Sequence, residues 1–434
     1  MEKLKKSRYN IFVPYNDEET IIFNGLTGAI GKFDTETMTR FENNSLYDNE
    51  VEILKKKGIL VSIDNDEIFK INADRSSGIN NENTKHFRIW TTSSCNARCY
   101  YCFENGISHI SMSVETANAV VGYIEKLLKK DDKLEIEWFG GEPLLNSRII
   151  DYISERLITI CKARGCTYQA SMISNGSLIS DTIINKMKSV WKISAIQITL
   201  DGYGEVYDQT KRYLNPSDHN FINVLKNIKK LSENNIFVSI RMNYDTHNYE
   251  SLITLIDFLH SELHGQKKIG YYIYPIWDAL NEDDPNPFHT NTEADKNLIS
   301  LFEMLVEYGM NNVLNIARLK YRKHQCKSCN KYSCAILADG NIVKCSETFN
   351  QILGNVWTGI AETQKYDFWI STELDEKCKE CVYLPICQGG CKSSYFTKMR
   401  QCFAFKPIIN DILKWYVSRL DNNRSSNTVT EKNK

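Results

Sequence analysis

Three closely spaced cysteines form the clearest chemical pattern in the sequence. Cys95, Cys99 and Cys102 are separated by three and by two residues. Thiolates are the ligands that zinc and iron–sulfur clusters prefer. A structural zinc site is normally closed by four ligands, and no fourth ligand is evident near these three. Three thiolates on one short loop can instead bind three corners of a cubane [4Fe-4S] cluster, which leaves one iron open to a small molecule.

A second group of cysteines follows much later in the chain. It contains nine of the 14 cysteines: Cys326, Cys329, Cys334, Cys345, Cys378, Cys381, Cys387, Cys391 and Cys402. Thiols at this density in a reducing compartment indicate metal binding rather than disulfides. Two zinc sites with four thiolates each and two iron–sulfur clusters are both compatible with the spacing. Outside the two groups, Cys161 and Cys166 are expected to be small packing residues.

Charge and hydropathy restrict the partners of the chain. The 434 residues contain 53 Lys and Arg against 54 Asp and Glu, so the net charge is −1. No basic field exists that would hold a nucleic acid or an anionic membrane surface. We find no apolar run of the roughly 20 residues that a membrane span needs, and the N-terminus lacks the apolar core of a signal peptide. We therefore expect a cytoplasmic protein without nucleic-acid or membrane partners.

The middle of the chain alternates strands and helices, which predicts the scaffold of the first cysteine loop. Six strands are expected, at 87–92, 134–139, 167–173, 193–200, 236–243 and 269–275. Helices are expected after them, at 113–130, 147–164, 180–190, 219–234, 248–264 and 293–311. Six such units over 86–312 predict an α/β fold with a parallel sheet, arranged as a partial (β/α)6 TIM-like barrel. Ligands then bind at the carboxyl ends of the strands, where the loop of Cys95 lies.

Two further units flank this barrel. Residues 1–80 read as a winged-helix-like α+β module, with strands at 9–13, 20–23, 59–63 and 68–71 and a helix at 41–57. Residues 75–85 read as a linker, because they are rich in Ser, Gly and Asn. The cysteine-rich residues 320–420 form a third unit that takes its order more from metal than from a core. It ends in a helix at 403–420, and residues 421–434 are expected to be a disordered tail.

The cysteine loop, placed directly after the first barrel strand, resembles the signature of the radical S-adenosylmethionine (SAM) enzymes. The resemblance implies that the open iron binds SAM through its amino and carboxylate groups. One electron, supplied by a reductant such as flavodoxin or ferredoxin, then cleaves a C–S bond and produces a 5′-deoxyadenosyl radical. It also implies that Tyr101, just before the last cysteine, lies against the adenine.

The resemblance extends to polar residues at the ends of later strands. Gly140, Gly141 and Glu142 are similar to the GGE motif of the family, in which the carboxylate receives the SAM ammonium and the glycines allow close approach to the ligand. The other expected SAM contacts are Ser174 and Asn175 after the third strand, Thr199 on the fourth, Lys211 or its neighbour Arg212, and Asn243 on the fifth. No catalytic acid or base is assigned.

The second cysteine group resembles the SPASM extension of radical SAM enzymes that modify peptides. The extension binds two auxiliary [4Fe-4S] clusters, which makes three clusters in all. Carried over by position, one cluster would use Cys334, Cys345, Cys391 and either Cys326 or Cys329. The other would use Cys378, Cys381, Cys387 and Cys402.

The N-terminal module is similar to elements that recognise the leader of a precursor peptide by adding its strand to a sheet edge. Together these resemblances predict a maturase that abstracts hydrogen from a precursor peptide and forms a cross-link, with a thioether favoured over carbon–carbon and carbon–oxygen bonds. The alternatives are a formylglycine-generating enzyme for sulfatases, a peptide epimerase, and a non-catalytic binding protein that holds zinc.

Overall fold

The fold described here is that of a computed structural model. It describes residues 3–215, 221–276, 292–312, 315, 319–323, 326–396 and 402–431. The backbone, without side chains, is described for 292–295 and 422–431.

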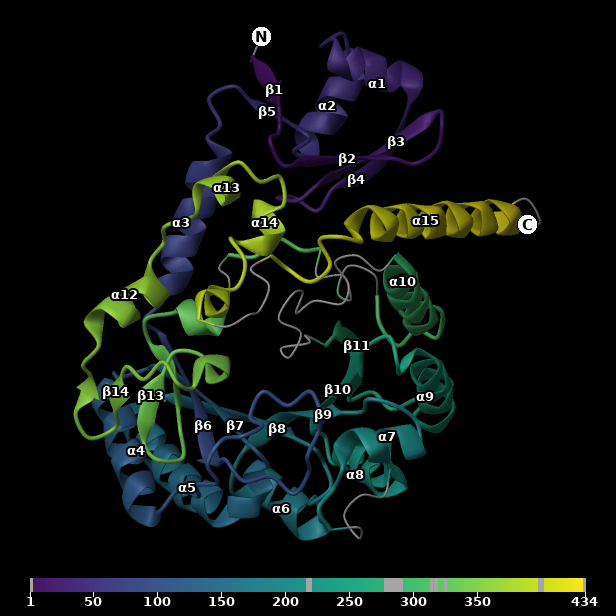
Figure 1. The fold of residues 1–434 in the computed structure, drawn as a ribbon. Coiled ribbons are helices and arrows are strands. Elements are labelled where there is room, and N and C mark those ends of the chain that lie inside the picture. Colours follow the sequence, from purple (N-terminus) through teal and green to yellow (C-terminus); the bar gives the residue numbers. More distant parts are fainter. Residues whose placement is uncertain are drawn as a thin grey trace.

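A parallel sheet of six strands forms the middle of the chain. The strands are β6 (Thr84–Thr92), β7 (Lys133–Gly140), β8 (Thr167–Ser174), β9 (Ile193–Thr199), β10 (Phe237–Tyr244) and β11 (Ile269–Pro275). They are hydrogen-bonded in sequence order, and every pair is parallel. Figure 1 shows the strands arranged as a curved row with helices on its outer side. The predicted partial (β/α)6 barrel is confirmed.

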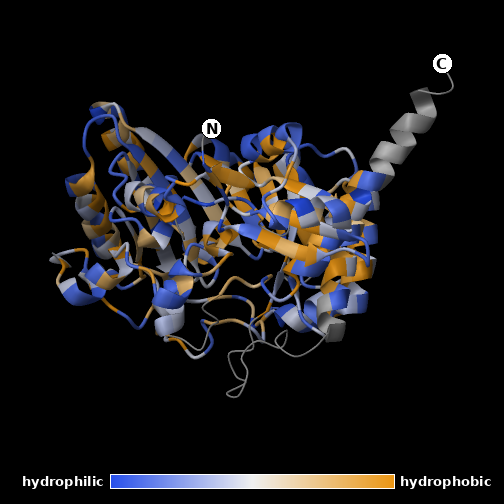
Figure 2. Cartoon of the chain, turned by 90° about the horizontal axis from the view of Figure 1, so that it is seen from above, coloured by the Kyte–Doolittle hydropathy of each residue, from blue (hydrophilic) through white to orange (hydrophobic). Residues whose placement is uncertain are grey.

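Amphipathic helices cover the outer face of this sheet. They are α4 (Val114–Leu127), α5 (Ser147–Arg164), α6 (Asp181–Ser189), α7 (Glu205–Lys211), α8 (Phe221–Glu233), α9 (Tyr249–Glu262) and α10 (Thr292–Glu307). Figure 2 shows hydrophobic and hydrophilic residues side by side along the helices, as expected of helices that bury one face. Ser113 begins α4 because its hydroxyl accepts a hydrogen bond from the Thr116 amide at 3.0 Å. Helix α7 is the one that the sequence pattern did not predict.

The N-terminal module combines two small antiparallel sheets with two helices. One sheet pairs β1 (Leu4–Lys6) with β5 (Leu60–Ser62). The other has the order β2 (Asn10–Pro14), β3 (Glu19–Asn24), β4 (Ile30–Asp34). The predicted helix at 41–57 is in fact two helices, α1 (Thr35–Glu42) and α2 (Asp48–Lys56).

A third helix, α3 (Glu67–Ile79), replaces two predicted features of this region. The strand at 68–71 and the linker beginning at residue 75 were wrong. Asp66 caps the helix by accepting a hydrogen bond from the Phe69 amide at 3.0 Å. Ile71, Arg75 and Ile79 are buried at a spacing of four residues, which is the period of a helix. A buried arginine in that series hid the pattern from a reading based on apolar residues.

The cysteine-rich segment continues the barrel sheet. Strand β12 (Ser333–Ile336) pairs in parallel with β6, and β13 (Asn341–Val343), β14 (Gly354–Asn355) and β15 (Gly359–Ile360) extend the edge. The predicted hairpin before Cys345 is confirmed, with Gly340 in its turn at φ +86°. Short helices follow: α12 (Thr363–Ile370), α13 (Glu376–Lys379) and α14 (Leu384–Cys387), with 3-10 turns η3 (Lys327–Cys329), η4 (Ser346–Thr348) and η5 (Lys392–Tyr395).

The last element is helix α15 (Ile409–Glu431), which projects from the molecule in Figure 1. It begins later than the predicted helix at 403–420. Its backbone is helical as far as Glu431, within the segment 421–434 that we expected to be a disordered tail.

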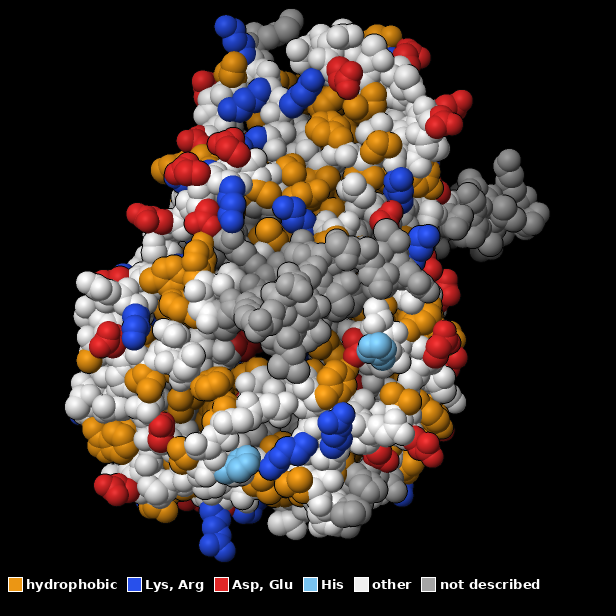
Figure 3. Space-filling model, in the orientation of Figure 1, with side chains coloured by type: hydrophobic (Ala, Val, Ile, Leu, Met, Phe, Trp, Pro, Cys, Tyr) orange, Lys and Arg blue, Asp and Glu red, His pale blue; other side chains and the backbone are white. Residues whose placement is uncertain are grey.

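Acidic and basic side chains are interspersed on the face seen in Figure 3, without a broad patch of either sign. Within the described part of the chain, no helix combines the length and the apolar character needed to cross a bilayer.

Candidate active site

Two glycines let the end of β7 lie directly against the cysteine loop. At Gly140, which has φ +114°, an added Cβ would lie 2.0 Å from the carbonyl oxygen of Thr92. At Gly141 it would lie 2.4 Å from the carbonyl oxygen of Ser94. The Glu142 amide donates to that same Ser94 oxygen at 2.9 Å. The structure therefore shows that both glycines allow close contact with the loop backbone, and their expected contact with SAM stays a prediction.

Glu142 is completely buried at the start of the 3-10 turn η1 (Pro143–Asn146). Its carboxylate accepts hydrogen bonds from the amide of Asn175 at 2.8 Å and from the hydroxyl of Ser174 at 3.0 Å. Burial raises the pKa of Glu142 to about 7, although these hydrogen bonds oppose the shift. The structure thus brings together three residues that the sequence had assigned to one ligand.

Asn175 extends this cluster to the cysteine loop. Its side-chain amide donates to the Oδ1 atom of Asn96 at 2.8 Å and lies 4.0 Å from the Sγ atom of Cys95. The Asn96 amide group in turn donates to the hydroxyl of Ser177 at 2.9 Å. Asn96 was missed by the sequence analysis, because an asparagine between two cysteines has no distinctive spacing of its own.

A second buried network holds the other side of the loop. The ammonium of Lys211 donates to Asp201 at 2.8 Å and to the hydroxyl of Tyr101 at 3.3 Å, and the Tyr101 hydroxyl donates to Asp201. Burial alone would lower the pKa of Lys211, but the Asp201 carboxylate beside it raises that pKa above its ordinary value. Burial also raises the pKa of Tyr101, so its hydroxyl stays a donor. The Arg98 amide donates to the Lys211 carbonyl at 2.8 Å, which fixes the loop.

The other residues expected to contact SAM differ in their burial and in their hydrogen bonds. Arg212 is exposed, and its Nε atom donates to the carbonyl of Gln209, so Lys211 is the inward-facing member of the pair. Asn243 is buried, and its amide donates to Asp201 at 3.1 Å while its side-chain oxygen accepts from Arg241 at 2.7 Å. Thr199 ends β9, in register with Arg241 on β10.

The donor set of the loop fits an iron–sulfur cluster. Burial raises the pKa of both Cys95 and Cys102 to about 12, so cluster binding must displace their protons. The Sγ atom of Cys99 lies 3.9 Å from the Lys211 carbonyl oxygen. Cys95, Cys99 and Cys102 are the residues that would hold the cluster.

Four cysteines of the later group line one cavity of about 120 Å³. They are Cys378, Cys381, Cys387 and Cys402, the set that the resemblance assigned to one auxiliary cluster. Aromatic and basic residues complete the walls, among them Tyr383, Phe403 and Lys406. The Lys406 ammonium lies 3.9 Å from the Sγ atom of Cys402. A soft, four-thiolate donor set around a single cavity fits a closed [4Fe-4S] cluster.

The other cysteines gather beside the barrel. Cys326 and Cys334 line a second cavity together with Arg88, Glu137 and Lys344. The Sγ atoms of Cys326 and Cys329 are 3.9 Å apart. Burial raises the pKa of Cys345 to about 12, with smaller contributions from Glu347, Cys326 and Cys391. These cysteines can also supply the four thiolates of a cluster, with either Cys326 or Cys329 as one of the four ligands.

A single metal ion is a poorer fit. Among the described residues, no three Cys, His, Asp or Glu side chains converge closely enough to bind one ion. A zinc site with four thiolates needs such convergence, whereas a cubane spreads its ligands over four irons.

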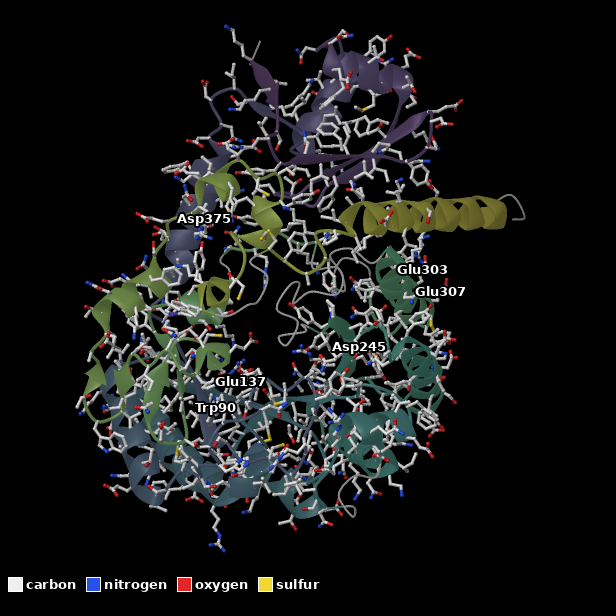
Figure 4. The ribbon with its side chains drawn as sticks, viewed as in Figure 1. Trp90, Glu137, Asp245, Glu303, Glu307 and Asp375 are labelled. Atoms are coloured by element: carbon white, nitrogen blue, oxygen red, sulfur yellow. The ribbon has the colours of Figure 1, made fainter. Side chains whose placement is uncertain are left out.

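Charged residues line the interior of the barrel between these sites. Arg88 on β6 pairs with Glu137 on β7 at 2.5 Å, and its guanidinium also reaches the hydroxyl of Ser346. In Figure 4, Trp90 and Glu137 lie close together on the neighbouring strands β6 and β7, and Asp245 lies across from them, directly after β10. The Tyr100 hydroxyl donates to Asp245. Arg88 and Glu137 were not predicted as site residues, because charged positions within strands carry no motif.

A known family model matches the middle of the chain. Residues 90–259 match the family model of the Radical SAM superfamily. An uncharacterised protein of Methanocaldococcus jannaschii is 32% identical over 133 residues, and that match spans 30% of this chain and 43% of the relative, less than two thirds of its length.

Two longer relatives carry functional names. The radical SAM cyclopropyl synthase TigE of Paramaledivibacter caminithermalis is 22% identical over 96% of both chains. A cysteine-type anaerobic sulfatase-maturating enzyme of Clostridium novyi is 23% identical over 69% of this chain and 86% of its own.

Solved structures share the fold. The enzyme anSMEcpe with bound AdoMet superimposes with a TM-score of 0.59 at 16% identity, covering 78% of this chain and 98% of its own. SuiB of Streptococcus suis, bound to the precursor peptide SuiA, superimposes with a TM-score of 0.52 at 15% identity, covering 92% and 98%. The matched segment contains the cysteine loop and most of the partial barrel, so we conclude that residues 90–259 carry a Radical SAM domain and that the protein is an enzyme.

Proposed function

We propose that the protein modifies a precursor peptide by abstracting a hydrogen atom, and that it joins a cysteine sulfur to carbon in a thioether cross-link. The observation that carries the proposal is the pairing of a three-cysteine loop, tied to Glu142 and Asn175, with two further cysteine sets in the same chain. The first site generates a radical, and the others accept an electron.

The residues of the first site have separate tasks in this scheme. With its cluster and SAM bound, the site supplies a 5′-deoxyadenosyl radical. Glu142 accepts a hydrogen bond from the SAM amino group, and Ser174 and Asn175 hold that carboxylate in place. Lys211 and Asp201 orient Tyr101 beside the adenine. Thr199 and Asn243 line the ribose and carboxylate side, while Arg212 has no part.

Two auxiliary clusters complete the cofactors in this proposal. One is held by Cys378, Cys381, Cys387 and Cys402, which share a cavity. The other is held by Cys334, Cys345, Cys391 and one of Cys326 and Cys329. Thioether formation removes two hydrogen atoms from the peptide: the radical takes one, and the other leaves as a thiol proton and an electron. An auxiliary cluster receives that electron, and a flavodoxin or ferredoxin is the external redox partner.

The peptide substrate is supported by the relatives and by the interior of the barrel. SuiB is solved with its precursor peptide, and anSMEcpe shares the fold. In this chain, Arg88, Glu137 and Asp245 offer charges to a polar peptide backbone inside the barrel. The N-terminal module, with sheet edges at β2 and β4, is proposed to bind the leader, and the cytoplasm is the proposed compartment.

A carbon–carbon product is the second candidate. TigE, a cyclopropyl synthase, aligns over nearly the whole of this chain. Ring closure between two carbons also removes two hydrogen atoms, but it leaves every cysteine thiol of the peptide free. Formylglycine formation, the reaction class of the Clostridium novyi relative, is less well supported, because it calls for no leader-binding module. Peptide epimerisation stays an alternative, with Cys326 as a thiol that could return the hydrogen atom.

The test is anaerobic turnover with SAM, a reductant and a candidate precursor peptide, followed by mass spectrometry with and without thiol alkylation. A thioether gives a peptide lighter by two hydrogen atoms that has lost one alkylation site. A loss of two hydrogen atoms with all alkylation sites retained supports the carbon–carbon candidate. Deoxyadenosine formation without change in any peptide refutes the peptide proposal and leaves the radical chemistry intact.

A further inference from the structure

Three cationic side chains are buried around the later cysteines: Arg75, Lys344 and Lys392. Their relative exposures are 1%, 2% and 8%. The hydrogen bonds of all three go to backbone carbonyl oxygens, which are those of Gln388 and Thr372, of Asn330 and Ser333, and of Phe368, Trp369 and Ser371. None of them forms an ion pair with a carboxylate of the described residues. Buried cations without a counter-charge are strongly unfavourable.

The negative charge near these cations comes from the cysteines and, at Lys392, also from Glu373. The charges that act on Arg75 are those of Cys329, Cys378 and Cys387, and Cys329 also acts on both lysines. Neutral thiols cannot compensate three cations. Clusters held by four thiolates carry net negative charge, so the auxiliary clusters of the proposed function would supply the missing counter-charge.

Arg75 has a special place among the three, because it lies between the two cysteine sets. Its helix α3 packs through Ile71 against Leu384 and Cys378 on one side. At its other end, the carbonyl of Ile79 accepts a hydrogen bond from the Lys331 amide at 2.9 Å, two residues after Cys329. Between these contacts the Arg75 Nη1 atom donates to the Gln388 carbonyl, directly after Cys387. The helix therefore joins the two segments that carry the cysteines.

The guanidinium of Arg75 also has one hydrogen-bond donor that is not used. Its Nε atom is buried and has no hydrogen-bond partner. A buried donor without an acceptor is rare in native proteins, and it indicates that a group with lone pairs belongs beside it. Cluster sulfur is such a group, and hydrogen bonds to cluster sulfurs are one of the levers that set reduction potentials.

We infer that Arg75 is the shared counter-charge of the two auxiliary clusters and that it raises their reduction potentials. The inference rests on the proposed function only in that both clusters must exist. A buried cation stabilises the reduced form, which carries one more negative charge than the oxidised form. Arg75 lies on α3, outside the SAM site described above, so the role inferred for it is electrostatic and not catalytic.

The test isolates the auxiliary clusters in the full-length chain. Cys95, Cys99 and Cys102 are replaced by Ala to remove the first cluster, and the remaining clusters are titrated with dithionite under electron paramagnetic resonance. Arg75→Met removes the charge, and Arg75→Lys keeps it. Arg8→Met is the matched control: Arg8 also joins the N-terminal module to the cysteine segment, through Glu380, but its side chain is 37% exposed.

We expect Arg75→Met to lower the ratio of reduced to oxidised clusters at least tenfold at a given potential, which is a shift of about 59 mV for one electron. Arg75→Lys should retain most of the parental ratio, and Arg8→Met all of it. Loss of auxiliary iron in Arg75→Met but not in Arg75→Lys also supports the inference, because only the charge differs.

Two results overturn the inference. The first is an unchanged titration in Arg75→Met with full iron content. The second is equal loss of iron in Arg75→Met and Arg75→Lys, which would assign Arg75 a packing role. Failure of the proposed clusters looks different, because the parental variant without Cys95, Cys99 and Cys102 would then contain no iron before Arg75 is changed.

Discussion

The ammonium of Lys211 and the carboxylate of Asp201 lie 2.8 Å apart, and both side chains are almost completely buried. Asp201 follows β9, and Lys211 ends α7, so the ion pair ties these two elements together. Because the Lys211 backbone also accepts a hydrogen bond from Arg98, the pair supports the loop between Cys95 and Cys99.

Removing one partner of this ion pair should lower the stability of the protein. Lys211→Met leaves the Asp201 carboxylate buried without its partner, and we expect a loss of about 3–5 kcal/mol in the free energy of unfolding, measured by urea denaturation of the cluster-free protein. The control Arg212→Met removes an exposed charge next door and should change stability by less than about 0.5 kcal/mol. The double change Asp201→Asn with Lys211→Met should recover part of the loss; if it is as unstable as Lys211→Met or worse, the account of the pair is wrong.

Gly141→Ala tests the contact between β7 and the cysteine loop. The added Cβ would lie 2.4 Å from the Ser94 carbonyl oxygen, so the backbone must move. We expect the protein to lose at least tenfold in the rate of deoxyadenosine formation and to bind less iron, measured by chromatography and iron analysis.

A helical glycine provides the matched control for this change. Gly122 lies within α4, and an added Cβ would have no neighbour within 4 Å. Gly122→Ala should leave deoxyadenosine formation unchanged and stabilise the protein by about 0.5–1 kcal/mol. Equal activity in the two alanine variants would contradict the role assigned to Gly141.

The affinity for SAM should depend on pH through Glu142. Burial raises the pKa of Glu142 to about 7, so the folded protein prefers the protonated carboxyl. Its contribution to stability is therefore full below the unfolded value near 4.5 and is lost as the pH rises through about 7. SAM needs the ionised carboxylate, so its affinity should fall as the pH drops below 7 and level off above it.

Isothermal titration calorimetry of the anaerobic, cluster-loaded protein between pH 6 and 8 measures this dependence. Glu142→Gln should bind SAM weakly and without the step near pH 7. Glu205→Gln, which alters an exposed carboxylate at the start of α7, should keep the parental profile. An unaltered profile in Glu142→Gln would show that another group controls binding.

The four-cysteine cavity makes a prediction about iron content. Cys381→Ser should remove the iron of one cluster while SAM cleavage in the absence of peptide continues, because the first site is separate. Cys161→Ser, a buried cysteine outside both groups, should keep the full iron and sulfide content. Colorimetric iron and sulfide analysis distinguishes these outcomes, and identical iron content in the two variants would remove Cys381 from the ligand set.

Much of the barrel could be predicted from the sequence, because its strands and helices follow simple hydrophobic periods. The spacing of Cys95, Cys99 and Cys102 predicted a loop that binds a cluster. The strand before them predicted that this loop lies at the carboxyl edge of the sheet. The hairpin around Gly340 was equally readable, since an Asp-Gly turn separated two apolar runs.

Other features depended on tertiary contacts that no local pattern expresses. Helix α3 was read as a strand and a linker, because one of its buried positions is Arg75, whose partners lie more than 290 residues away. The addition of β12 to the edge of β6 is likewise a long-range pairing. The choice between Lys211 and Arg212 required the direction of each side chain, which a sequence of two adjacent basic residues does not contain.

The most direct test of the account is electron paramagnetic resonance of the anaerobically reduced protein before and after addition of SAM. We predict a [4Fe-4S] signal that depends on Cys99 and changes on SAM binding, because one iron is not held by the protein. A signal that SAM leaves unaltered, or a protein without iron, would contradict the central claim.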